Sequence, residues 1–137
     1  MHLSAATIRR SLASLAVIAV LFGAGAARAD VIKVSKKAKV GSYLTDSKGM
    51  TLYTFKKDTA GKSDCTGECL EKWPAYHDAK IQVGGKLSAK EFGTITREDG
   101  KEQTTFKGKP LYYFAGDKKP GDTNGQGVRD LWVVAKP

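Results

Sequence analysis

Short segments with the residue pattern of β-strands alternate with turn-forming residues along this chain. Residues 31–34 alternate between apolar and polar side chains, which is typical of a first strand or of a loose arm. Residues 43–45 and 51–55 are rich in β-forming residues. Gly49 lies between them and can adopt the positive φ that a tight turn needs. The pattern therefore predicts a β-hairpin over residues 43–55.

The second half of the chain has the same arrangement. Residues 103–106 lead through a Lys-Gly-Lys turn into the β-forming residues 111–114. Pro110 has no backbone N–H, so it belongs at a strand start or at a sheet edge. Residues 93–97 precede Asp99-Gly100, a dipeptide favoured in hairpin turns, and we expect them to pair with residues 103–106.

The segment between these two regions predicts only short elements. Residues 81–83 are typical of a short strand, and two glycines follow it. Ser88 can cap one helical turn over residues 88–92. Outside the first thirty residues there is no long stretch with a period of 3.6 residues. We therefore predict an all-β fold, a small barrel or sandwich built from two similar halves, with a short helical turn at most in the linker.

An internal duplication accounts for the two similar halves. Residues 48–58 recur as residues 107–117 at a constant offset of 59, and Lys, Gly, Leu, Tyr, Phe and Asp return at equivalent positions. Trp73 and Trp132 keep that offset. Chance identity is about one position in fifteen for average composition, so six matches in eleven indicate a duplication. We place the repeats at about 41–78 and 100–137.

The duplicated residues have two possible roles, as ligand sites or as parts of the architecture. Alternate residues of a strand share a face, so Tyr53 and Phe55 should point one way and anchor the core. Asp58 follows three residues later, where a carboxylate can accept backbone N–H bonds or a tyrosine hydroxyl bond. A unique active site needs its groups once, whereas residues that determine the fold recur with it. We therefore interpret the motif as a structural fastener of each repeat. Its members are Tyr53, Phe55, Asp58 and Trp73 in the first repeat and Tyr112, Phe114, Asp117 and Trp132 in the second.

The spacing Tyr-x-Phe-x-x-Asp, preceded twice by Lys-Gly-x-x-Leu, resembles the secreted-repeat family of predicted lipoproteins. The segment from Cys65 to Trp73-Pro74 and the Gly-rich run into Trp132 are similar to that family as well. The resemblance covers nearly all of the chain after residue 29 and implies no known chemistry, because the family is one of unknown function. Many members carry a lipid-accepting Cys at the cleavage site, whereas the first Cys here is Cys65. We therefore expect a protein without a stable membrane anchor.

The first 29 residues have the layout of a secretory signal peptide. Arg9 and Arg10 form a basic start, residues 12–25 are almost wholly apolar or small, and Ala27-Arg28-Ala29 fits a cleavage site. The apolar run is too short to favour a membrane span. We expect residues 30–137 to form a single exported β domain that is periplasmic or secreted.

A basic charge remains after the leader is removed. Loss of Arg9, Arg10 and Arg28 leaves twenty basic and fourteen acidic residues, a net charge of +6. In an exported protein this charge suits an anionic envelope component better than nucleic acid. A solvated, solubilising surface accounts for many of the lysines. The lysines that carry the excess are Lys33, Lys36, Lys37, Lys39, Lys56, Lys57, Lys118 and Lys119.

Residues found in only one repeat are the better candidates for chemistry. Cys65 and Cys69 are expected to form a structural disulfide, because two cysteines of an exported chain usually pair. A redox or metal-handling role remains the alternative, with Met50 and His77 as partners of the cysteines. A calcium loop over residues 116–127 lacks the required spacing, so a surface turn is preferred there.

The sequence thus predicts an exported envelope module with a binding or structural role rather than an enzyme. We assign no catalytic residue, no cofactor site and no metal site from the sequence. The alternative is a periplasmic redox or metal-handling protein that uses Cys65, Cys69 and His77. The oligomeric state is left open.

Overall fold

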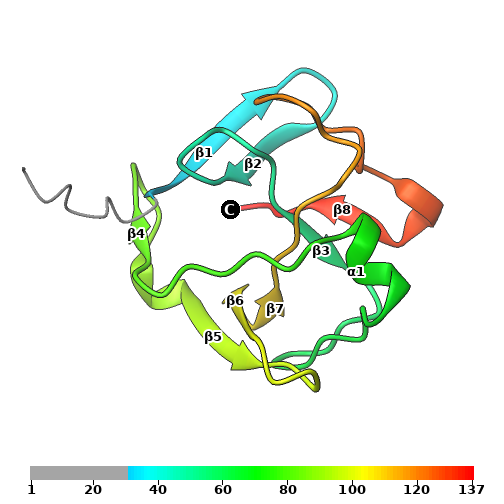
Figure 1. The fold of residues 1–137 in the computed structure, drawn as a ribbon. Helices are drawn as coiled ribbons and strands as arrows, with labels where there is room; N and C mark the ends of the chain where they lie inside the picture. The colour runs from blue at the N-terminus through cyan, green and yellow to red at the C-terminus, as the bar shows by residue number, and fades with distance from the viewer. Residues whose placement is uncertain (1–30) are drawn as a thin grey trace, which may run out of the picture.

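The computed structural model describes residues 31–137, so the predicted signal peptide, residues 1–29, lies outside the described residues. The described part contains eight short strands, one α-helix and two 3-10 helices (Figure 1). In chain order they are β1 (Val31–Lys37), β2 (Gly41–Thr45), β3 (Tyr53–Phe55), α1 (Glu68–Lys72), β4 (Gln82–Val83), η1 (Ala89–Glu91), β5 (Phe92–Thr96), β6 (Glu102–Phe106), β7 (Lys109–Pro110), η2 (Val128–Asp130) and β8 (Trp132–Val134).

The strands form three small sheets, with the orders β2-β1-β4, β3-β8 and β5-β6-β7. The prediction of an all-β fold with two similar halves is confirmed. β5 and β6 pair antiparallel from Phe92 opposite Phe106 to Thr96 opposite Glu102, as the turn dipeptide indicated. Pro110 lies in the edge strand β7.

Other elements differ from the prediction. α1 and η2 lie within the repeats, where the sequence indicated no helix. The predicted hairpin over residues 43–55 is reduced to the Thr45–Thr51 bridge, because β2 pairs with β1 and β3 pairs with β8. Residues 111–114, predicted to be a strand, form only isolated bridges at Tyr112.

The C-terminal segment of the second repeat completes the first repeat. β8 pairs antiparallel with β3, so that Trp132 lies opposite Phe55 (Figure 1). Directly after β8, the N–H of Ala135 donates to the carbonyl of Leu52 over 2.8 Å, and the N–H of Leu44 donates to the carbonyl of Ala135 over 2.9 Å. Backbone groups of the first repeat are therefore satisfied by residues far away in the sequence.

The equivalent segment of the first repeat completes the second one in the same way. Tyr76, 59 residues before Ala135, donates its N–H to the carbonyl of Leu111 over 2.9 Å and accepts from the N–H of Thr104 over 2.8 Å. Tyr53 and Tyr112 exchange two backbone hydrogen bonds of 2.8 and 2.9 Å at the centre of this arrangement. The two repeats thus exchange their C-terminal segments, and the contact between them is called the seam below.

Two hydrophobic clusters fill the interior, and the strand alternation of the motif divides residues between them. Leu52 and Leu111 enter one cluster, whereas Tyr53 and Tyr112 enter the other, as expected for neighbours in a strand. The first cluster consists of Ile32, Leu44, Leu52, Tyr76, Phe106, Leu111 and Ala135. The second consists of Tyr43, Tyr53, Cys65, Trp73, Tyr112, Trp132 and Val134.

Candidate functional site

The motif tyrosines and aspartates form hydrogen bonds across the seam. The hydroxyl of Tyr53 donates to Asp117 Oδ2 over 2.6 Å, and the hydroxyl of Tyr112 donates to Asp58 Oδ2 over 2.6 Å. The sequence indicated a fastener within each repeat. The observed hydrogen bonds instead join each tyrosine to the aspartate of the other repeat, because the exchanged C-terminal segments bring the two copies face to face.

Each motif aspartate also bonds within its own repeat. Asp58 Oδ1 accepts the backbone N–H of Asp64 over 2.7 Å, and Asp117 Oδ1 accepts that of Asn124 over 2.9 Å. One carboxylate therefore ties the loop that follows its own strand to the tyrosine of the other repeat. This is the loop-closing role that a carboxylate can fulfil at a strand end.

Burial governs the ionisation of these four groups. It raises the pKa of the Tyr53 and Tyr112 hydroxyls well above the usual range, and the hydrogen bond to the partner aspartate raises it further. Burial also raises the pKa of the Asp58 and Asp117 carboxyls, while the tyrosine hydrogen bonds oppose that shift. Burial thus favours the neutral phenol in both tyrosines, and each phenol donates to the aspartate of the other repeat.

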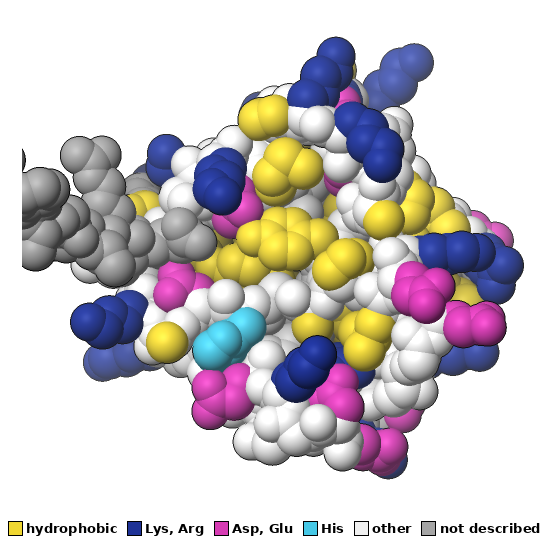
Figure 2. All heavy atoms as spheres, viewed as in Figure 1, with side chains coloured by type: hydrophobic (Ala, Val, Ile, Leu, Met, Phe, Trp, Pro, Cys, Tyr) yellow, Lys and Arg dark blue, Asp and Glu magenta, His cyan; other side chains and the backbone are white. Residues whose placement is uncertain are grey.

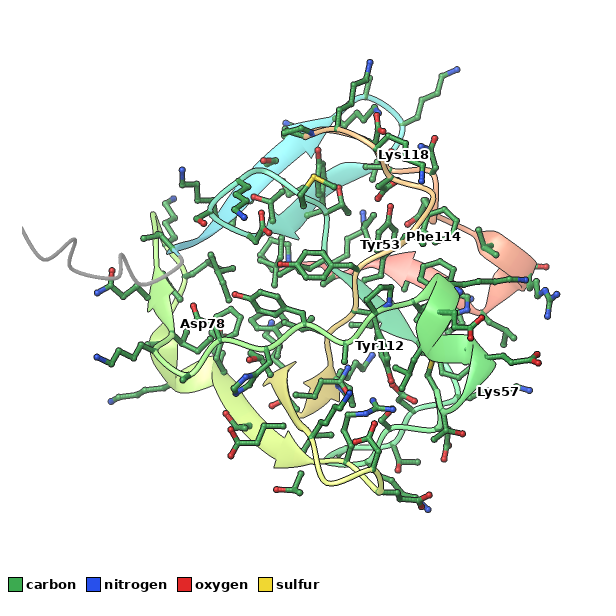
Figure 3. All side chains as sticks on the ribbon, in the orientation of Figure 1. Tyr53, Lys57, Asp78, Tyr112, Phe114 and Lys118 are labelled. Atoms are coloured by element: carbon green, nitrogen blue, oxygen red, sulfur yellow. A yellow bond between two sulfur atoms is a disulfide. The ribbon has the colours of Figure 1, made fainter. Side chains whose placement is uncertain are left out.

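The other four motif residues form a continuous stack of rings across the seam. The order is Phe55, Trp132, Trp73 and Phe114, with ring centroids 4.3, 3.7 and 4.3 Å apart. The two indoles are nearly parallel, with an interplanar angle of 2°, and only 3–4% of each tryptophan is exposed. Figure 3 places Tyr53 and Phe114 close together near α1, in agreement with their ring distance of 6.1 Å.

The loops beside the stack differ between the repeats. In the second repeat the N–H of Gly125 donates to the Tyr53 hydroxyl over 3.1 Å. A Cβ atom on Gly125 would lie 2.8 Å from the Tyr53 ring and 2.9 Å from that of Trp73, so only glycine fits there. In the first repeat the Ser63 hydroxyl bonds to the Tyr112 hydroxyl over 2.5 Å, and Cys65 packs among the aromatic rings.

A buried arginine, which the sequence did not single out, supports the loop of the first repeat. Arg97 is 6% exposed, and its Nη1 donates to Ser63 Oγ over 2.7 Å and to Gln103 Oε1 over 2.5 Å. Its Nη2 donates to the carbonyl of Cys65, and its Nε lies 3.5 Å from Asp99 Oδ2. The alternation of β5 could have predicted that Arg97 is buried. Arg97 follows the half-buried Ile95 by two residues, so the two side chains share a face.

The one-copy residues proposed for redox or metal chemistry are separated. Cys65 and Cys69 form a disulfide, as expected. His77 Nε2 lies 3.2 Å from Glu102 Oε2 on the surface. Within residues 31–137 no group of three or more His, Cys, Asp or Glu side chains is placed to hold a metal ion. No observation therefore favours the redox or metal-handling alternative.

A cavity of about 570 Å³ opens at the seam, and all four rings of the stack line it. This seam cavity also receives Lys57, Lys72 and Arg129 as cations and Glu68 as an acidic group. α1 contributes Glu68 and Lys72, and η2 contributes Arg129. Figure 3 shows Lys57 farther out from the molecular centre than Phe114. The sequence motif did not point to the polar residues of the cavity. The sequence had indicated Lys57 alone, as one of the lysines that carry the excess charge.

Three turns bring six exposed lysines together at one end of the molecule. The Lys37 Nζ donates to the carbonyl of Gly121 over 3.0 Å, and the N–H of Gly121 donates to the carbonyl of Gly49 over 3.3 Å. In Figure 1 the orange loop runs beside the β1–β2 hairpin, and Figure 2 shows basic side chains gathered at that upper end. The lysines of this basic crown are Lys36, Lys37, Lys39, Lys48, Lys118 and Lys119.

The acidic groups near the basic crown are used by the backbone and by tyrosine. Asp122 Oδ2 accepts the N–H groups of Lys118 and Lys119 over 2.9 and 3.2 Å. Asp46 is 4% exposed and accepts the N–H groups of Lys48 and Met50 and the hydroxyl of Tyr113. The six crown lysines are all exposed. The Lys37 and Lys118 ammonium groups donate to backbone carbonyls rather than to carboxylates.

In the described part of the chain, no helix has both the length and the apolar content required to cross a membrane. Comparison with curated proteins and with solved structures found no match. Comparison with family models found one described as a secreted repeat of unknown function, which matches residues 34–76 and again residues 93–136. Because these two matches cover more than half of the chain, the protein belongs to this family of secreted repeats.

Proposed function

We propose that this protein is an exported, non-enzymatic binding module of the cell envelope, and that its basic crown binds an anionic envelope component. The observation that carries the proposal is the convergence of six lysines from three separate turns. The hydrogen bonds between these turns keep their lysines at one end of the molecule. Membership of a secreted family supports export, and the periplasm is the compartment we propose.

The crown has the electrostatic character that such binding needs. Each Lys near an anionic membrane surface contributes about 1 kcal/mol, and the attraction falls off over about 8 Å at physiological ionic strength. Several adjacent lysines therefore act together on a surface, whereas lysines spread around the molecule cannot all face it. Asp122 offsets part of this charge, because its carboxylate keeps its negative charge beside Lys119 and Lys37. The six lysines still outnumber it, so the crown stays basic.

Sedimentation with vesicles tests the proposal. The probe is a set of phosphatidylcholine vesicles with and without phosphatidylglycerol, each at low and high salt, followed by a purified envelope fraction. We expect binding to the anionic vesicles at low salt, and its loss at high salt or when the anionic lipid is omitted.

Matched variants separate the crown from overall charge. Four crown lysines change to Gln in one variant: Lys36, Lys39, Lys48 and Lys119. Four lysines elsewhere change to Gln in the control of equal net charge: Lys80, Lys86, Lys90 and Lys101. The crown variant should lose most of the vesicle binding and the control should keep it. If both variants lost vesicle binding equally, net charge alone would explain the binding. That result would overturn the proposed role of the crown.

A further inference from the structure

The seam cavity has the size and lining of a small-molecule site. Its volume of about 570 Å³ lies within the range of about 300–1,000 Å³ that is typical of ligand pockets. Its apolar wall is the ring stack, so both repeats build it, with ring centroids 3.7–4.3 Å apart. A site built on such a wall is preorganised.

The two indoles of the stack present only their edges to the cavity. Each indole has both faces covered, Trp73 by Trp132 and Phe114, and Trp132 by Trp73 and Phe55. The edge of an aromatic ring carries the positive end of its quadrupole, whereas the face carries the negative end. The indole edges in this wall therefore favour electron-rich groups over cations.

The rim adds formal positive charge to this wall. Lys57, Lys72 and Arg129 line the cavity against a single acidic residue, Glu68. The ion pairs found in residues 31–137 are His77–Glu102, Arg97–Asp99 and Lys107–Glu91, so no carboxylate neutralises any of these three cations. An anion that entered the cavity would meet unpaired cations.

The architecture does not require these cations. At the offset of 59, Gly116 stands in place of Lys57, Leu131 in place of Lys72, and Leu70 in place of Arg129. Each repeat thus forms its ring contacts even at the positions where only the other repeat has a cation. Arg129 moreover has a left-handed backbone with φ of 53°, a conformation that costs on the order of 1 kcal/mol or more for a non-glycine residue. In this strained conformation the loop positions the Arg129 guanidinium at the cavity rim.

We propose that the seam cavity binds a small organic anion that has an apolar body, with its carboxylate or phosphate at the three cations and its body against the ring edges. Charge complementarity and the aromatic wall each favour one part of such a ligand. This site is separate from the basic crown, which would bind an extended anionic surface.

The two tryptophans of the protein both lie in the ring stack, so their indole N–H signals in NMR report on the cavity directly. Residues 30–137 are titrated with naphthoate. Naphthylmethanol and acetate are titrated in parallel. We expect naphthoate to shift both indole signals with saturation. The neutral alcohol and the anion without an apolar body should each bind about tenfold or more weakly, because each lacks half of the interaction.

Variants assign the binding to the rim. A triple change of Lys57, Lys72 and Arg129 to Gln should weaken naphthoate binding about tenfold or more and leave vesicle binding in place. A matched triple change of Lys80, Lys86 and Lys90 to Gln should leave the affinity for naphthoate unchanged. Glu68→Gln should tighten binding, which is a gain that misfolding cannot produce.

Three outcomes would overturn the inference. They are unshifted indole signals at millimolar naphthoate, equal affinity for naphthylmethanol, and an equal loss of affinity in the matched control triple. The crown variant separates this inference from the proposed function, because it should lose vesicle binding and keep naphthoate binding.

Discussion

The repeated tyrosines and aspartates act reciprocally at the scale of single residues. Tyr53 and Asp117 belong to different repeats, as do Tyr112 and Asp58, and each pair is joined by a short hydrogen bond. Each copy of the motif therefore supplies a donor, its tyrosine, and an acceptor, its aspartate, to the other half. Hydrogen bonds to a charged partner are stronger than neutral ones, which suits groups that must hold two halves together.

Removal of one hydroxyl tests the strength of this link. Tyr53→Phe should lower the free energy of unfolding by about 1–3 kcal/mol, because Asp117 is 8% exposed and would lose its donor. Urea denaturation measures the change, and a double-mutant cycle with Asp117→Asn isolates the pair. Tyr43→Phe is the control, because Tyr43 is a buried tyrosine of the same cluster that belongs to neither Tyr–Asp pair. A coupling of zero in the cycle would contradict the role of the pair.

Alkali should destabilise the fold through the same tyrosines. The folded pKa values of Tyr53 and Tyr112 are raised above the unfolded value of about 10. The stabilisation that this shift provides is complete below pH 10 or so and is lost as the pH rises through the folded values. Tyrosinate absorbance should therefore appear for these two residues only together with the loss of tertiary circular dichroism. Their ionisation in a fully folded protein would contradict the burial of the pairs.

At the scale of elements, the two repeats pack different structures against the same ring stack. The first repeat places α1 and the Cys65–Cys69 disulfide beside the ring stack, whereas the second places Gly125 and η2 there. Arg97, from the β5–β6 hairpin, braces the loop of the first repeat only. The elements that differ between the repeats are therefore also those that line the seam cavity, α1 and η2.

Removal of the disulfide tests whether it is required for the seam. The change of Cys65 and Cys69 to Ala should lower the free energy of unfolding by about 2 kcal/mol, because the bond closes only a short loop. The ring stack should persist, since the second repeat makes its ring contacts without a disulfide. Chemical denaturation gives the energy and near-ultraviolet circular dichroism reports the stack. Loss of the near-ultraviolet signal would show that the disulfide organises the seam itself.

At the scale of the whole molecule, the exchange of C-terminal segments makes the two halves interdependent. Ala135 completes the backbone bonding of the first repeat, and Tyr76 completes that of the second. Neither half can lose its structure without leaving backbone groups of the other half unpaired. The duplication in sequence therefore does not produce two independent folding units.

Hydrogen exchange can test this interdependence. Asp58→Asn, a change in the first repeat, should lower the protection of β5–β6 amides as much as that of β1–β2 amides, because unfolding is global. Equal changes in both hairpins are expected by mass spectrometry or NMR. The control is Lys80→Gln, an exposed change that should alter neither hairpin. Loss of protection confined to the first repeat would contradict cooperative unfolding of the two halves.

Local sequence signals determined the all-β character, the β5–β6 hairpin and the division of the motif between two faces. They did not determine the partners of β2 and β3. The Asp99-Gly100 turn fixed the β5–β6 pairing, and strand alternation separated Leu52 from Tyr53. The identity of the family could be recognised from the motif spacing alone. These features depend on residues close together in the chain, and such residues carry their own conformational preferences.

Tertiary structure alone decided how the two copies meet. Nothing local indicates that Tyr53 bonds to Asp117 rather than to Asp58, that Lys37 meets Gly121, or that Arg97 reaches Ser63. The helix α1 was missed as well, because its five residues are too few to show a helical period. The seam cavity and the basic crown depend on such pairings between distant segments. A sequence pattern states which side chains are available, but only the closure of the chain determines which of them become neighbours.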